Sequence, residues 1–101
     1  MENQIIHDSE AGRFNMTVDG ITAHVAYQIK GRDFDIRHTI VPEAIGGRGI
    51  ASKLVKAAYD YALEQGLTPV ATCAYAVVWL ERHPEYGGRV SEECADGACA
   101  L

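Results

Sequence analysis

The sequence predicts an α+β domain with a mixed, mostly antiparallel sheet. Apolar residues recur at every second position in the first half, which is the period of half-buried strands, and at helical spacing after residue 50. A chain of 101 residues, 48% of them hydrophobic, is long enough for one core and too short for two. We therefore expect one domain over residues 1–88, followed by a flexible tail over 89–101 that is small and polar and has no periodicity.

The first half favours an antiparallel meander. A short apolar stretch at Ile5 and Ile6 predicts a first strand. Residues 13–18 alternate between polar and apolar, Asp19 and Gly20 then form a strong hairpin signal, and residues 21–30 return antiparallel.

A third long strand follows the turn at Gly31 and ends at Pro42. Its alternation predicts that the side chains of one face are those of Phe34, Ile36, His38 and Ile40.

The second half predicts a strand, a glycine-rich loop, a helix, a strand and a helix. The first helix begins near Ile50 and ends at Gly66, a residue that readily adopts the left-handed conformation of a helix C-terminus. A short apolar strand covers residues 70–73. The spacing from Ala76 to His83 then indicates a second amphipathic helix, which Pro84 terminates.

The loop before the first helix has the chemistry of a phosphate site. Glycines at 46, 47 and 49 allow positive φ and close approach of a ligand, and the amides of the first helical turn have no intrahelical partner. Arg48 and Lys53 add positive charge. A P-loop is excluded because no Gly-Lys-Ser/Thr occurs, and a dinucleotide fingerprint would have Ser52 at its last position and lacks a following acidic residue.

Composition disfavours several classes of partner and of site. A net charge of -5 disfavours binding to nucleic acid, and no apolar run is long enough to span a membrane, so we expect a cytoplasmic protein with neither partner. The three cysteines have no metal-finger spacing, which predicts no metal site.

The chain resembles the GNAT acetyltransferase superfamily, and in particular its small members of about one hundred residues. The residues that carry the resemblance span roughly 4–86. They are His38-Thr39-x-Val41-Pro42, the loop Gly46-Gly47-Arg48-Gly49-Ile50-Ala51, Cys73-x-Tyr75 and His83-Pro84-Glu85-Tyr86. The family usually has Gln or Arg where this chain has Gly46, so a side-chain contact to the cofactor is missing there.

The resemblance implies an N-acetyltransferase whose co-substrate is acetyl-CoA and whose acceptor is an amine, in a protein or a small molecule. The pantetheine would pair with backbone at Thr39, Ile40 and Val41. The pyrophosphate would bind the loop and the start of the helix, that is Gly46, Gly47, Arg48, Gly49, Ile50, Ala51 and Ser52, with Lys53 one turn further on.

For catalysis, the resemblance places Leu80 where many relatives have a tyrosine that protonates the departing thiolate. The remaining candidates are Cys73, Tyr75 and His38, each able to move a proton, and Cys73 is also able to accept the acyl group. Each has a purely structural alternative: Cys73 and His38 as core residues, Tyr75 as a sheet-edge residue. Two other functions remain open, a non-catalytic module that binds CoA or acyl-CoA and a partner-binding domain without a CoA site.

Overall fold

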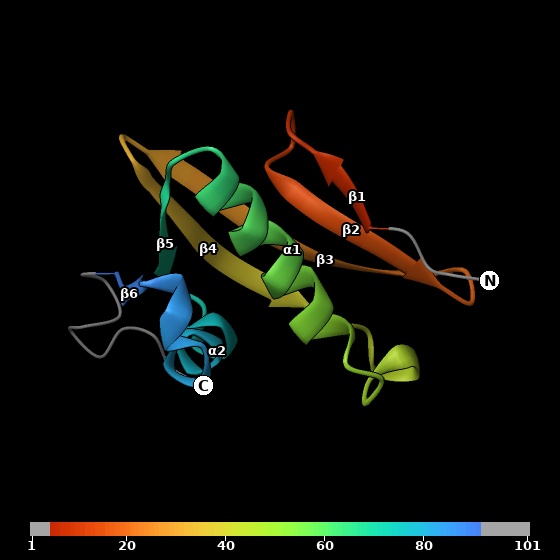
Figure 1. The fold of residues 1–101 in the computed structure, drawn as a ribbon. Helices are drawn as coiled ribbons and strands as arrows, with labels where there is room; N and C mark the ends of the chain where they lie inside the picture. The colour runs from red at the N-terminus through yellow and green to blue at the C-terminus, as the bar shows by residue number, and fades with distance from the viewer. Residues whose placement is uncertain (1–4, 92–101) are drawn as a thin grey trace.

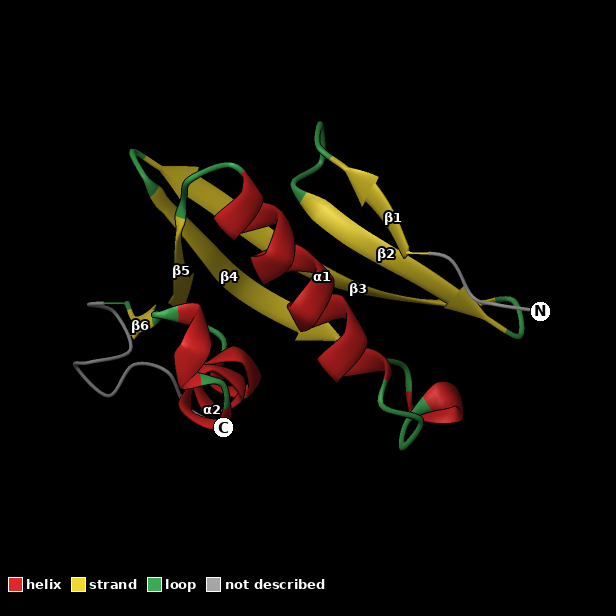
Figure 2. Ribbon diagram, in the orientation of Figure 1, coloured by secondary structure: helices red, strands yellow, loops and turns green. Residues whose placement is uncertain are grey.

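The computed structural model describes residues 5–91, which form one six-stranded sheet and two α-helices (Figure 1, Figure 2). The strands lie in the sheet in their chain order. They are β1 (Ile5–Asp8), β2 (Arg13–Val18), β3 (Ile21–Lys30), β4 (Asp33–Ile40), β5 (Thr68–Ala71) and β6 (Arg89–Val90). The helices are α1 (Ile50–Glu64) and α2 (Ala74–Arg82), with short 3-10 turns at Glu43–Ile45 and Pro84–Tyr86. The predicted α+β class is confirmed.

The meander is antiparallel from β1 to β4, as predicted. Val18 pairs with Ile21, so Asp19 and Gly20 form a two-residue hairpin turn. Both residues have positive φ, 53° and 77°, which is the geometry whose twist matches that of the flanking strands.

A β-bulge in β4 changes which side chains share a face. Tyr27 of β3 pairs with Ile36, but the preceding Ala26 pairs with His38, so Arg37 is an extra residue. An extra residue moves every later side chain to the other face of the sheet. Phe34 and Ile36 are fully buried while His38 is exposed and Ile40 is 50% exposed. The prediction that His38 and Ile40 share the apolar face of Phe34 and Ile36 is therefore wrong.

Both helices pack onto one face of the sheet. Leu54, Val55 and Ala58 of α1 and Trp79 of α2 belong to the same hydrophobic core, which the buried side chains of β2–β5 complete. The helix α1 crosses β2–β5 (Figure 1). It ends as predicted: Gly66 has a φ of 75°, and the next amide, that of Leu67, donates to the carbonyl of Ala62.

The opposite face, which we call the open face, is polar and largely exposed. It carries Arg13, Thr17, Thr22, Gln28 and Lys30, all exposed, and, after the bulge, His38. Among residues 5–91, no helix has the length and apolar character needed to cross a membrane.

The sheet continues beyond the predicted domain boundary at residue 88. Arg89–Val90 form β6, parallel to β5, and the amide of the buried Ser91 donates to the carbonyl of Ala71 at 2.8 Å. The boundary placed after residue 88 is thus too early. The rest of the predicted tail, 92–101, including Cys94 and Cys99, lies outside the described residues.

Candidate functional site

The strands β4 and β5 are paired over half of β4 and then separate. Their parallel pairing runs from Asp33 opposite Thr68 to Ile36 opposite Ala71. The carbonyl of Ile36 then accepts hydrogen bonds from the amides of both Thr72 and Cys73, each at 3.0 Å. We call this point the fork.

Beyond the fork, β4 runs on to Ile40 while the chain after Cys73 turns into α2. In the described part of the chain, Thr39 and Ile40 pair only with β3, so the edge of β4 that faces α2 offers its backbone groups to a ligand. An extended chain containing amides can bind such an edge as an added strand does.

The loop before α1 leaves a run of backbone amides without partners. Gly47 and Gly49 have φ values of 76° and 73°, which glycine adopts at little cost. Within residues 5–91, the amides from Gly47 to Ser52 donate no hydrogen bond, and the first amide of this region that does so is that of Lys53, to the carbonyl of Gly49. Six consecutive donors at the positive end of a helix dipole fit a pyrophosphate.

Gly46 differs from the other two glycines of the loop. Its φ of -68° and ψ of 161° are accessible to every residue type, so the expectation that Gly46 also provides positive φ is wrong. A Cβ built there would lie 3.3 Å from the carbonyl oxygen of Glu43, a close contact that a small shift relieves.

The predicted cations sit at the edge of the loop. Arg48 makes an ion pair of 2.9 Å with Asp19 of the β2–β3 turn, and both side chains are more than half exposed. Exposed pairs of this kind contribute little to stability, so the guanidinium is free to exchange its partner for a phosphate. Lys53 is exposed in the first turn of α1.

A cavity of about 210 Å³ lies between the start of α1 and one side of α2. The Oγ of Ser52 accepts a hydrogen bond from Trp79 Nε1 at 3.1 Å, which joins the two helices at its floor. The ring of His83 stacks on Trp79 at a centroid distance of 3.9 Å. The residues that line it are Ser52, Tyr75, Val78, Trp79, Arg82 and His83.

The sequence placed Ser52 in the predicted cofactor loop and Tyr75 among the catalytic candidates, but it did not identify Arg82 as a lining residue. The signal available was helical: Tyr75, Trp79 and Arg82 follow one another at intervals of four and three residues, and so lie on one side of a helix. Together with the free amides of α1, this side of α2 provides an aromatic surface and a positive charge for a phosphorylated ligand.

Of the three candidate catalytic residues, only Cys73 lies at the fork. It is half-buried, and its Sγ donates a hydrogen bond of 3.4 Å to Thr39 Oγ1 across the gap between β4 and α2. Tyr75 is 41% exposed and lines the cavity between the helices. His38 is on the open face because of the bulge. The structure therefore brings together Cys73 and Thr39 but not His38 and Tyr75.

Asp35 is a buried acid that sequence reasoning missed. Its residue exposure is 6%, it forms an ion pair of 3.1 Å with Arg37, and both of its carboxylate oxygens lie 2.9 Å from Thr72 Oγ1. Asp35 lies between Phe34 and Ile36 in the sequence. The alternation of the strand places its side chain on the face opposite theirs, where the pattern predicts exposure to solvent. The Asp35 carboxylate contacts Thr72, whose amide hydrogen bond marks the fork, and it is therefore available to accept a proton there.

Tyr59, by contrast, is a structural residue beneath the fork. Burial, with a smaller contribution from the negative charge of Asp35, raises the pKa of its phenol. The hydroxyl therefore stays protonated, and it donates to the carbonyl of Val70 at 2.7 Å. Tyr59 supports β5 from the side of α1.

Comparison with known proteins gives consistent matches. A family model described as GCN5-related N-acetyl-transferase matches residues 13–90. Protein NATD1 of Gallus gallus is 37% identical over 84 residues, which are 80% of this chain and 76% of that protein. NATD1 of Homo sapiens is 36% identical over 84 residues, which are 80% of this chain and 74% of that protein.

A solved structure also resembles the fold. The NMR structure of a GCN5-like protein from Staphylococcus aureus superposes with a TM-score of 0.68 at 27% identity, and the alignment covers 87% of each chain. The structural resemblance thus covers most of the chain.

Proposed function

The chain belongs to the GCN5-related N-acetyltransferase family, and on that premise we propose that it moves an acetyl group from acetyl-CoA to an amine. Family membership supports acetyl transfer in general. The type of acceptor and the roles of the individual residues are part of our proposal.

The observation that carries the proposal is the combination of an unpaired β4 edge beyond the fork and a run of free amides at the start of α1. The unpaired edge of β4 at Thr39 and Ile40 suits the two amides of pantetheine, and the free amides from Gly47 to Ser52 suit the pyrophosphate. Arg82 and the partly exposed ring of Tyr75 line the neighbouring cavity, where the remainder of the nucleotide would follow. One extended ligand can thus occupy all three features with its thioester at the fork.

In the proposed reaction, the uncharged amine nitrogen attacks the thioester carbonyl, the C–N bond forms and the C–S bond breaks. The negative charge that develops on the carbonyl oxygen would be stabilised by amide donors of the free β4 edge. The proton lost by the amine goes to a base, and the departing thiolate takes a proton from an acid.

Cys73 is our choice for the acid, because its thiol hydrogen bonds toward Thr39 inside the fork. Asp35, on the other side of the same fork, is our choice for the base, directly or through one water. The Cys73 thiol and the Asp35 carboxylate lie on opposite sides of the sheet, which keeps the proton donor and the proton acceptor apart. The two-step route, in which the Cys73 thiolate first takes the acetyl group, is the alternative mechanism.

A matched pair of substitutions at Ala51 tests the cofactor site. Ala51→Asp places a negative charge in the first turn of α1, where it stabilises the helix but repels a pyrophosphate. Ala51→Asn has nearly the same shape and no charge. We expect calorimetry to show CoA binding weakened about tenfold or more by Asp relative to Asn, with no loss of melting temperature. Equal affinities of the two variants would place the pyrophosphate elsewhere.

A non-catalytic CoA-binding module is the second candidate. Leu80 has a hydrocarbon side chain that packs in the core and has no proton to donate, and Tyr75 is in the cavity between the helices. Turnover separates the candidates: release of CoA with formation of acetylated amine supports the enzyme, whereas binding without turnover supports the module.

A further inference from the structure

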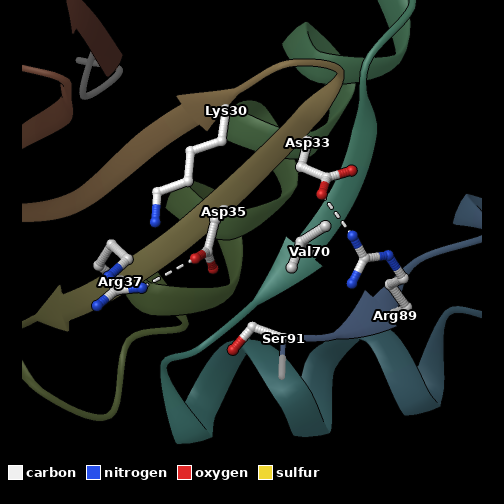
Figure 3. Close-up of a pocket in the computed structure, with 7 residues that line it drawn as sticks. All are labelled: Lys30, Asp33, Asp35, Arg37, Val70, Arg89 and Ser91. Carbon is white, nitrogen blue, oxygen red and sulfur yellow. Dashed lines mark hydrogen bonds and ion pairs between the residues drawn. The ribbon is translucent and has the colours of Figure 1, made fainter. Parts of the chain in front are cut away.

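A second cavity, of about 300 Å³, lies on the open face between the ends of β3, β4, β5 and β6 (Figure 3). Its polar lining comes from Lys30, Asp33, Asp35, Arg37, Arg89 and Ser91. Because these side chains project from the face opposite α1, this cavity is separate from the path assigned to CoA. Its size is at the lower end of the range for small-molecule sites.

The cavity reaches the fork through Thr72. Consecutive residues there point to opposite faces: Thr72 Oγ1 lies 2.9 Å from the Asp35 carboxylate and 2.8 Å from Ser91 Oγ, whereas Cys73 Sγ contacts Thr39. The amides of both residues bond to the same carbonyl of Ile36, where the pairing of β4 and β5 ends, so the cavity and the fork adjoin each other at this point. A molecule in the cavity can therefore approach a thioester at the fork from the open face.

The charges of the cavity favour an anion. Asp35 is paired with Arg37, and Asp33 is paired with Arg89, so both acids are already balanced (Figure 3). Lys30 has no ion pair with any residue from 5 to 91, and its side chain lines the same cavity as that of Arg37 (Figure 3). Among the described residues that line the cavity, Lys30 is thus a cation without an ion pair, and such a cation attracts a negative group and repels a polycation.

We propose that this cavity binds the acceptor and that the acceptor is a small amine carrying an anionic group, a carboxylate or a phosphate. The inference rests on the proposed acetyl transfer. Lys30 holds the anionic group, and the amine points to the fork, where Asp35 takes its proton as the C–N bond forms. Lys30 acts here as a specificity residue with no part in the chemical step.

The test uses three amines of similar basicity: β-alanine with a carboxylate, phosphoethanolamine with a phosphate, and propylamine with neither. CoA release from acetyl-CoA is followed for the full chain and for Lys30→Met, which keeps an unbranched side chain without the charge. We expect kcat/KM for the preferred anionic amine to exceed that for propylamine about tenfold. We also expect Lys30→Met to remove this preference by raising KM for the anionic amine toward that for propylamine. A preference for only one of the anionic amines identifies the group as carboxylate or phosphate.

The control is Lys56→Met, the same substitution on the exposed side of α1, where Lys56 pairs with Asp60 across one helical turn. It should leave all three rates unchanged. If the parent and Lys30→Met both use propylamine, β-alanine and phosphoethanolamine equally well, the acceptor inference is overturned while acetyl transfer stands.

A binding experiment separates the inference from the proposed function. In the presence of CoA, β-alanine or phosphoethanolamine should shift the amide NMR signals of Arg37, Val70 and Ser91. Turnover without such shifts overturns the acceptor site alone. Failure of the chain to bind acetyl-CoA in calorimetry, or binding of it with no turnover on any amine, overturns the proposed function itself.

Discussion

Gly46 and Gly47 are adjacent in the loop before α1, yet their backbones make opposite demands. Gly47 has a φ of 76° and needs glycine, whereas Gly46 has extended backbone that accepts any side chain. The backbone at position 46 can therefore carry a longer polar side chain, which this chain lacks.

Replacing Gly46 with Gln should therefore tighten CoA binding. One added hydrogen bond to a phosphate contributes roughly 0.5 to 3 kcal/mol when the Cβ contact with Glu43 relaxes. Calorimetry gives the affinity, and Gly47→Gln is the control, expected to destabilise the loop by about 1 kcal/mol. Weaker CoA binding by Gly46→Gln at an unchanged melting temperature would show that the site needs an unobstructed backbone at this position.

Cys73 is the residue whose substitution tests both proposed routes of acetyl transfer. We expect Cys73→Ala to lower kcat about 100-fold, in the range for loss of a general acid, while Cys73→Ser binds CoA like the parent. Intact-mass analysis after incubation with acetyl-CoA shows whether an acetyl group resides on the thiol. Full turnover by Cys73→Ala without any acetyl adduct would remove the residue from both routes.

At the scale of elements, the β2–β3 hairpin and the strand β6 form for different reasons. The β2–β3 hairpin is determined by its own two turn residues, whereas β6 is two residues long and exists only through its pairing with β5. Ser91, the residue after β6, is buried, and its Oγ lies 2.8 Å from Thr72 Oγ1. The segment that contains β6 and Ser91 therefore also closes one side of the open-face cavity.

Shortening the chain tests the contribution of β6. A chain ending at Gly88 should be less stable than a chain ending at Ser91 by about 1 to 3 kcal/mol, since it loses the β5–β6 hydrogen bonds and those of Ser91. Urea denaturation of the two shortened chains measures the difference. Identical midpoints and slopes would mean that the sheet does not depend on β6.

At the scale of the whole molecule, stability should depend on pH through two histidines. Burial lowers the pKa of His7, which stacks on Phe14 at 4.1 Å, against a smaller opposing influence of Asp8. Burial, together with the positive charges of Arg13 and His38, lowers the pKa of His24. The unfolded chain therefore binds protons on these rings at higher pH than the folded chain does.

The free energy of unfolding should be highest above the ordinary histidine pKa of 6.5 and fall as the pH drops below it. Urea denaturation at a series of pH values from 7.5 to 5 measures this decline. His24→Gln should make the decline shallower, and adding His7→Gln should flatten it further. A parent chain equally stable across this range, or a decline unchanged by both substitutions, would contradict this assignment.

The sequence by itself determined the local elements, because each depends on residues close together in the chain. Alternation predicted β2 and β3, Asp19 and Gly20 predicted their turn, Gly66 predicted the end of α1, and the glycines before Ile50 predicted the run of free amides. The motifs spaced along the chain were also enough for the family.

Only the tertiary structure decided what depends on pairing between distant residues. The bulge at Arg37 arises from the register of β4 on β3, and it moved His38 away from the predicted apolar face. Asp35 joins Thr72 and Ser91 only because β5 and β6 lie beside β4. A one-residue change of register leaves the periodic pattern of a short strand almost intact but reverses the faces of the side chains beyond it, so the side chains at the fork are set by strand pairing and not by local pattern.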